Sequence, residues 1–308
     1  MTRHPRTTRL SAIDDATASE IRALLALAED ADGVEAVSES FRLAIGPARE
    51  GVVHLLRLDE DDAVVGYAQV AQAGGPDAVA ELVVDPRHRR RGHGRALLDE
   101  VVALGARSVW AHGMLPAATA LAAAAGLVVT RELYVMSRPL TAEDAVDPVL
   151  PQGFSVRPFE PGVDDEHWAA LNAAAFASHP EQGQMSRADF DALTREPWFA
   201  ADDLRLAYAT SGERQGELAG FTWVKTVQEG NTTETELYVL GVDPTFAGIG
   251  LGAALLGETL RQMATHRPNR ITLYVDGDNT NAVALYARAG VGVEQRSMQY
   301  LRAATLPR

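Results

Sequence analysis

The sequence predicts an α/β protein of two tandem domains, each with a mixed, mostly antiparallel sheet flanked by helices. The chain has 308 residues, enough for two domains of about 150 residues each. An acidic, proline-containing segment at 139–153 interrupts the apolar periodicity near the midpoint, as linkers do. The same order of strands, glycine turn and helices occurs on both sides, which indicates duplication. We therefore expect domains at 1–140 and 153–308, joined by a linker at 141–152.

The first half begins with alternating apolar runs that lead to an Asp-Pro pair at 85–86. A turn with two glycines, Arg89 to Gly94, then opens an amphipathic helix. The expected strands are 52–58, 63–71, 78–84, 108–111 and 127–136, and the expected helices are 95–104 and the segment that ends at 125 before Gly126.

The second half repeats this order, with its Asp-Pro pair at 243–244 and its glycine turn at 247–252. Superposing the two Asp-Pro pairs places Gly92 on Gly250 and Gly94 on Gly252. The expected strands are 205–210, 217–227, 233–242, 270–275 and 291–301, and the expected helices run to about 264 and over 280–288.

Composition and charge exclude several classes of function. Lys and Arg number 28 against 42 Asp and Glu, a net charge of −14, which is the wrong sign for a general nucleic-acid binder. There is no cysteine, so a thiolate nucleophile and a cysteine-based zinc site are excluded. The eight histidines show no metal-ligand spacing, and no apolar run is long enough to span a membrane. We expect a cytoplasmic monomer without nucleic-acid or membrane partners. If the chain transfers acyl groups, the absence of cysteine requires that it use serine, a carboxylate or direct transfer between bound substrates.

The glycine turns predict phosphate binding. In RRRGHG (89–94) and AGIGLG (247–252), glycine lets successive N–H groups converge at the start of a helix, where they can bind a pyrophosphate. The Gly-Lys-Ser/Thr ending of a Walker loop is missing, and the spacing differs from the dinucleotide fingerprint. A basic surface loop is the alternative for the first turn, but the repetition of the turn between strand and helix favours phosphate.

These turns, each after a Val-Asp-Pro strand, resemble the acetyl-CoA signature of the GNAT N-acetyltransferase superfamily. The segment DNTNAVALYARAG (278–290) is similar to a second GNAT motif. The stretches DGVEAVSES, AELVVDP, RRRGHG, WAHG, AAFASHPEQG, ELYVLGVDP and LYVDGDN resemble the mycothiol synthase family of tandem GNAT enzymes, and they lie in both halves. The resemblance implies acetyl transfer from acetyl-CoA to the cysteinyl amine of a cysteine–glucosamine–inositol precursor, desacetylmycothiol.

The resemblance also implies which residues contact acetyl-CoA. In the first half these are expected to be Leu82, Val83, Val84, Arg89, Arg90, Arg91, Gly92, His93 and Gly94. In the second half they are expected to be Leu240, Gly241, Val242, Ala247, Gly248, Ile249, Gly250, Leu251, Gly252, Ala253, Asn279, Thr280, Asn281, Ala282, Val283 and Ala284. We expect two acetyl-CoA sites, the first tighter, because the second turn lacks basic side chains.

The internal alignment assigns the chemistry to the second half. Tyr286, a candidate acid for the departing CoA thiolate, aligns with Ala122. Glu236, a candidate base for the attacking amine, aligns with Ala78. Glu81 aligns with Val239 and is expected to face the other side of the sheet from Glu236. The first half would then bind acetyl-CoA without reacting.

The resemblance further implies a substrate site formed by Glu39, Glu181, Lys225, Glu236 and Tyr274. Carboxylates suit the cationic cysteinyl ammonium, and Lys and Tyr can hydrogen-bond sugar and inositol hydroxyls. Two other functions stay open at this point. One is acetylation of a different small amine, and the other is a non-catalytic acetyl-CoA sensor, which would not need Glu236 and Tyr286 in one half.

Overall fold

The computed structural model describes residues 4–177, 182–230 and 232–302. Its contacts divide the chain into two compact units. Unit 1 comprises residues 1–134, 276–278 and 295–308, and unit 2 comprises residues 135–275 and 279–294. Each unit has the predicted α/β architecture of a mixed sheet with helices on its faces.

Unit 1 is built on a sheet in which only one neighbouring pair of its first five strands is parallel. These strands occur in chain order across the sheet, and β4 and β5 form the parallel pair. They are β1 (Arg6–Leu10), β2 (Val53–Leu58), β3 (Val64–Ala71), β4 (Val79–Val84) and β5 (Ser108–His112).

The strand next to β5 comes from the other end of the sequence. β12 (Gly292–Arg302) starts in unit 2 and ends in unit 1, where Ser297–Leu301 pairs antiparallel with residues 108–112 of β5. β6 (Leu127–Pro139) starts in unit 1 and ends in unit 2. The prediction that 291–301 completes its own half is therefore wrong, because most of β12 belongs to unit 1. β6 keeps residues 127–134 in unit 1, as predicted, and only its residues 135–139 lie in unit 2, so the two units exchange the ends of these strands. The domain boundaries at 140 and 153 divide the sequence into consecutive stretches and stay a prediction.

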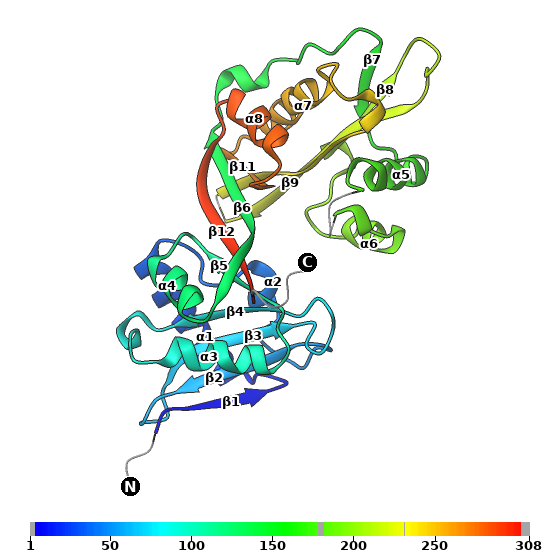
Figure 1. Ribbon diagram of the computed structural model, residues 1–308. Coiled ribbons are helices and arrows are strands. Elements are labelled where there is room, and N and C mark those ends of the chain that lie inside the picture. The colour runs from blue at the N-terminus through cyan, green and yellow to red at the C-terminus, as the bar shows by residue number, and fades with distance from the viewer. Residues whose placement is uncertain (1–3, 178–181, 231, 303–308) are drawn as a thin grey trace. The chain divides into compact units, whose positions relative to one another are not determined.

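Helices cover both faces of the sheet in unit 1 (Figure 1). α1 and α2 pack on one face with Leu56, Tyr67 and Val83, and α3 packs on the other with Leu55, Ala68 and Ala80. Adjacent strand residues thus serve opposite faces. The helices are α1 (Asp15–Asp32), α2 (Glu39–Leu43), α3 (His93–Ala103) and α4 (Pro116–Ala124).

Unit 2 repeats the plan with longer strands. β10 pairs antiparallel with β9 and parallel with β11, and β9, β8 and β7 continue the sheet as antiparallel neighbours. The strands are β7 (Phe154–Pro158), β8 (Leu204–Ala209), β9 (Leu218–Glu229), β10 (Thr232–Val242) and β11 (Arg270–Asp276).

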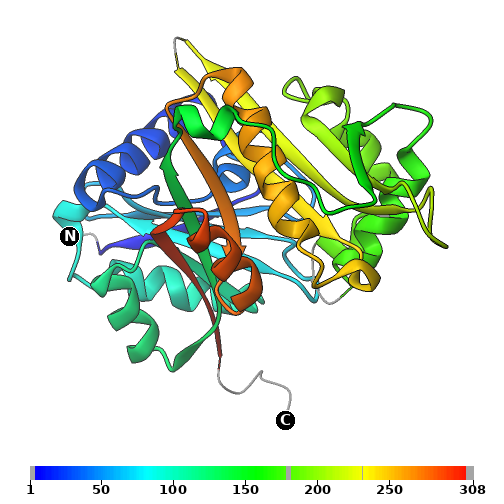
Figure 2. The same cartoon turned by 90° about the horizontal axis from the view of Figure 1, so that it is seen from above.

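The helices of unit 2 also divide between the two faces. α7 packs along β9 and β10 through Leu251 and Leu255 (gold helix over yellow strands in Figure 2). α5 and α6 cover the other face through Trp168 and Phe190, stacked 4.0 Å apart. The helices are α5 (Asp165–Ala175), α6 (Arg187–Leu193), α7 (Leu251–His266) and α8 (Thr280–Arg288).

The predicted linker contains local structure. Residues 142–145 form a short 3₁₀ turn that packs against α7, and Asp144 accepts hydrogen bonds from Arg138 at 2.5 and 2.8 Å. This ion pair holds the pKa of Asp144 below its usual value. The segment is therefore packed onto unit 2 over part of its length.

Candidate functional site

In each unit the parallel strand pair separates before its longer strand ends. In unit 1 the parallel pairing covers only Val79 and Ala80 of β4, although β4 continues to Val84 against β3. In unit 2 it covers only Thr235–Leu237 of β10, which continues to Val242 against β9. The last residues of β4 and β10 thus lack a strand partner on one side, within the described part of the chain. Their N–H and C=O groups can hydrogen-bond an extended ligand.

The turn after each of these strands has the geometry of an anion site. Arg90 and Gly92 adopt left-handed backbone angles in unit 1, with φ of 64° and 85°. Gly248 and Gly250 adopt the same conformation in unit 2, with φ of 81° and 89°. Helices α3 and α7 start directly afterwards, so their unpaired N–H groups and positive dipole ends point toward the turn.

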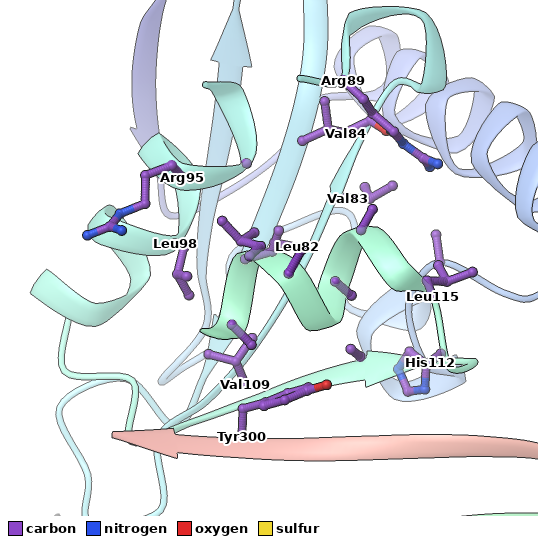
Figure 3. A pocket seen from close by; sticks show the side chains of 18 of the residues that line it. Leu82, Val83, Val84, Arg89, Arg95, Leu98, Val109, His112, Leu115 and Tyr300 are labelled. Carbon is purple, nitrogen blue, oxygen red and sulfur yellow. The ribbon is translucent and has the colours of Figure 1, made fainter. Parts of the chain in front are cut away.

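Unit 1 contains a cavity of about 420 Å³ between the separated strands (Figure 3). Its walls come from the end of β4, the glycine turn, α3, β5, α4, the loop after α1, and Tyr300 on β12. Of the residues predicted to bind acetyl-CoA, it is lined by Leu82, Val83, Val84, Arg89, Arg90, Gly92 and Gly94. Arg91 and His93 lie outside this lining, and His93 is buried with its Nδ1 accepting a hydrogen bond from Arg57.

The arginines of the first turn have different roles. Arg89 donates two hydrogen bonds to Asp32, at 2.7 and 2.6 Å, and a third to the carbonyl of Val84. The Asp32 carboxylate raises the pKa of Arg89 and also offsets its charge. Arg90 and Arg91 are exposed and make no ion pair with other described residues, so they can meet a phosphate directly.

The second turn provides backbone groups with little side-chain charge. Ala247, Gly248 and Ile249 form it, Leu251 is buried beneath it, and Gly252 and Ala253 follow in α7. The Asn279 side chain accepts the N–H of Ala282 and so caps α8, which begins at Thr280 and continues through Asn281, Val283 and Ala284. Leu240, Gly241 and Val242 occupy the open end of β10.

A bulge at Tyr238 determines which way Glu236 faces. The β9–β10 register shifts between Leu237 and Val239, so Tyr238 and Val239 both pack with the aromatic cluster under α5 and α6. Glu236 pairs with Lys225, whose Nζ lies 5.5 Å from the Trp198 ring in that cluster. Because of the extra residue in the bulge, Leu240 and Val242 face α7, the side opposite to Glu236.

This bulge also corrects the prediction for Glu81. The two units can be aligned through the register of β4 against β3 and that of β10 against β9. This alignment places Glu81 on Val239, but it places Val79, not Ala78, on Glu236. Glu81 accepts the N–H of Ser38 at the start of α2, so it faces the α1–α2 side, which corresponds to the α5–α6 side of Glu236. The prediction of opposite faces is wrong, since sequence alignment without a gap misses the extra residue.

Glu81 belongs to a buried polar cluster that the sequence analysis missed. Its carboxylate lies 3.2 Å from Nε2 of His112, which lines the cavity, and Nδ1 of His112 lies 3.2 Å from the Ser297 hydroxyl. Burial, aided by the charge of Glu81, raises the pKa of Tyr67. This cluster forms through strand pairing between residues 185 positions apart, so no local sequence motif predicts it.

Tyr286 lies on α8 and is 7% exposed. Burial raises its pKa to about 12, so the phenol keeps its proton throughout the neutral range. Its hydroxyl makes no hydrogen bond with the described part of the chain. A protonated, unpartnered phenol suits a group that donates to a ligand.

The structure places the other predicted substrate residues as follows. Lys225 and Tyr274 lie on β9 and β11 of unit 2, half-buried and exposed respectively. Glu39 is exposed at the first position of α2 in unit 1. Glu181 lies outside the described residues.

Two kinds of feature are absent from the described residues. None of the helices in these ranges is long and apolar enough to cross a membrane. No cluster of three metal-ligating side chains occurs in them either.

Comparisons with known proteins agree with this geometry. The model of the acetyltransferase (GNAT) family matches residues 168–291, and that of an acetyltransferase (GNAT) domain matches residues 51–130. Mycothiol acetyltransferases of Streptomyces coelicolor and Kineococcus radiotolerans are 47% and 48% identical to the chain, covering 91% of it and 90% and 91% of their own lengths.

Two solved structures share the fold. A GCN5-related N-acetyltransferase from Sphaerobacter thermophilus superposes with a TM-score of 0.76 at 22% identity, over 96% of this chain and 94% of that one. A tandem GNAT protein from the clavulanic acid biosynthesis pathway gives 0.70 at 21% identity, over 96% and 98%.

Fold and site thus define a tandem GNAT N-acetyltransferase, a class of enzymes whose co-substrate is acetyl-CoA. Within this class, the chain belongs to the mycothiol acetyltransferase family, which confirms the resemblance seen in its motifs.

Proposed function

We propose that this enzyme transfers the acetyl group of acetyl-CoA to the cysteinyl amine of desacetylmycothiol, giving mycothiol and CoA, and that unit 2 performs the reaction. The observation that carries the assignment is the bulged end of β10. There Glu236 faces the α5–α6 side, while the open strand edge at Leu240 and the start of α7 can bind the thioester and the pyrophosphate. No such register shift occurs between β3 and β4 in unit 1.

Each step of the transfer has a residue suited to it. Glu236, directly or through a water, takes a proton from the cysteinyl ammonium, and the free amine attacks the thioester carbonyl carbon. The backbone N–H of Leu240 or Gly241 stabilises the oxyanion that forms. The carbon–sulfur bond then breaks, and Tyr286 protonates the departing thiolate. The extra proton on the acetylated nitrogen passes to the resulting tyrosinate, which leaves the neutral amide, and Glu236 releases its proton to water. Direct transfer between bound substrates needs no enzyme nucleophile, which agrees with a chain that lacks cysteine.

The substrate and the second cofactor site complete the proposal. Lys225 and Tyr274 hydrogen-bond the sugar and inositol hydroxyls, and the carboxylates of Glu39, Glu181 and Glu236 attract the ammonium group. The cavity of unit 1 binds a second acetyl-CoA, whose phosphates contact Arg90 at the cavity lining and the adjacent, exposed Arg91.

Two variants test the catalytic roles. Tyr286→Phe removes the phenolic proton and keeps the ring, so acetyl-CoA binding should persist while kcat falls by about 10²-fold. Glu236→Gln should lower the rate most at and below neutral pH, where the amine is protonated, and less at high pH. The measurement is the pH dependence of acetylation of desacetylmycothiol, with a polyamine and an aminoglycoside as competing acceptors.

Two results would contradict the proposal. Near-parental rates at pH 7 for both variants would show that Glu236 and Tyr286 do not catalyse the reaction, so unit 2 would not be the catalytic unit. Faster acetylation of a competing amine would leave the reaction type intact and replace the substrate.

A further inference from the structure

The cavity of unit 1 has a phenol that the internal repeat does not account for. Tyr300 is 6% exposed and lines this cavity from β12, where it pairs with Val109 of β5. Figure 3 shows its hydroxyl oxygen turned into the cavity, on the side where His112 lies. This hydroxyl makes no hydrogen bond with any residue in the described ranges. The Tyr300 hydroxyl is not one of the fully buried side-chain atoms that lack a partner, and because Tyr300 lines the cavity its hydroxyl can donate to a ligand that enters there.

Tyr300 lies next to the position in unit 1 that corresponds to Tyr286 of unit 2. Ala122 on α4 aligns with Tyr286 on α8, so α4 provides no phenol. Tyr300 packs in one buried cluster with Ala122 and Met298, and its ring therefore occupies space beside the missing side chain. The small side chain at 122 and the large one at 300 are complementary, because a tyrosine at 122 would compete for the same volume.

We propose that Tyr300 donates a hydrogen bond to the sulfur of a CoA thiol or thioester bound in unit 1, taking from β12 the place that Tyr286 holds on α8 in unit 2. This rests on the proposed binding of acetyl-CoA in unit 1. Tyr300 acts here as a binding residue, and the carboxylate on the α1–α2 side of β4, Glu81, already accepts the N–H of Ser38 at 2.7 Å. The site therefore selects for sulfur-bearing CoA and holds it.

A spectroscopic probe inside the cavity allows ligand binding to unit 1 to be measured separately from binding to unit 2. The chain has four tryptophans, and Trp110 lines the cavity, whereas Trp168, Trp198 and Trp223 belong to unit 2. Replacing tryptophan with 5-fluorotryptophan gives four ¹⁹F resonances, and Trp110→Phe assigns the one that reports on unit 1. Titration with CoA and with desulfo-CoA, which lacks only the sulfur, then measures what the sulfur contributes there.

We expect the Trp110 resonance to show a threefold to tenfold preference for CoA over desulfo-CoA, the range of one neutral hydrogen bond. Tyr300→Phe should abolish this preference and leave the affinity for desulfo-CoA unchanged. Tyr134→Phe is the matched control, since its hydroxyl donates to Glu132 and it does not line the cavity. Because the Tyr300 hydroxyl is unpartnered, Tyr300→Phe should unfold at the parental temperature.

Two outcomes would overturn the proposal, and they differ from each other. An unchanged preference in Tyr300→Phe would show that this phenol does not contact the sulfur, while the second CoA site stands. No response of the Trp110 resonance to CoA would remove the second site itself. Neither result bears on acetyl transfer in unit 2, which the Glu236 and Tyr286 variants test.

Discussion

At the scale of single residues, the two glycine turns differ in which residue adopts the left-handed backbone conformation. Gly248 and Arg90 occupy equivalent positions with φ of 81° and 64°. Glycine adopts this conformation freely, whereas a side chain there costs roughly 1 kcal/mol. Unit 1 thus keeps a strained arginine where unit 2 has glycine, which is consistent with a contact to phosphate.

Arg90→Gly should therefore separate stability from binding. Relief of backbone strain and the greater entropy of glycine in the unfolded chain nearly cancel, so the free energy of unfolding should change by less than about 0.5 kcal/mol. Affinity for acetyl-CoA in unit 1 should fall by about fivefold to tenfold through loss of the charged contact. Urea denaturation and calorimetric titration check the two parts. An unchanged affinity would show that Arg90 does not reach the phosphates.

At the scale of elements, periodicity predicted most strands and helices from β2 to β12, because each buries a regular face. The bulge at Tyr238 was not predictable, since buried and half-buried residues alternate through it without interruption along β10. The pairing of β12 with β5 was not predictable either. It depends on contacts between residues about 190 positions apart, as between Ser108 and Gln299, which local patterns do not encode.

The 3₁₀ turn at Pro86–His88, which connects β4 to the glycine turn, predicts a pH effect. Asp85 is buried, caps this turn, and accepts hydrogen bonds from the Arg87 backbone and side chain. These bonds lower the pKa of Asp85 to about 2. A carboxylate with a depressed pKa stabilises the fold above its unfolded pKa of about 4, and this stabilisation is lost as pH falls toward 2.

Asp85→Asn should accordingly lower the free energy of unfolding by about 1–2 kcal/mol at pH 7, with the difference vanishing near pH 2. The exposure of Arg87 keeps the value modest. Asp99→Asn is the control, because Asp99 forms an exposed pair with Arg95 on α3 and should change stability by less than about 0.5 kcal/mol. Urea titrations from pH 2 to 7 measure both variants. An equal loss at all pH values would refute the titration of Asp85.

At the scale of the whole molecule, the two units repeat the same open strand pair and left-handed turn, but with different chemistry. Unit 1 has exposed arginines at the turn, and unit 2 has Glu236 beside a bulge and a buried Tyr286. Sequence motifs predicted this division of the candidate residues. They could not predict Tyr300 in the cavity of unit 1, because that residue arrives through strand exchange.

Calorimetric titration of the full chain should show two acetyl-CoA sites, the one in unit 1 tighter. Gly92→Val should weaken the tighter site and Gly250→Val the weaker one, because both positions require left-handed backbone angles. Gly105→Val is the control, since Gly105 has a φ of 88° but lies after α3, away from the cavity lining. One site in the parental chain, lost in Gly250→Val, would contradict the prediction.

The strand exchange has a consequence for how the protein is made. On the ribosome, residues 4–134 emerge first, yet the β5 edge of their sheet is covered by Ser297–Leu301, which is synthesised after the elements of unit 2. Until then β5 presents unpaired N–H and C=O groups, the kind of edge on which chains aggregate. Most of unit 1 is thus translated before unit 2, but its sheet is completed at the β5 edge only after unit 2 has been synthesised.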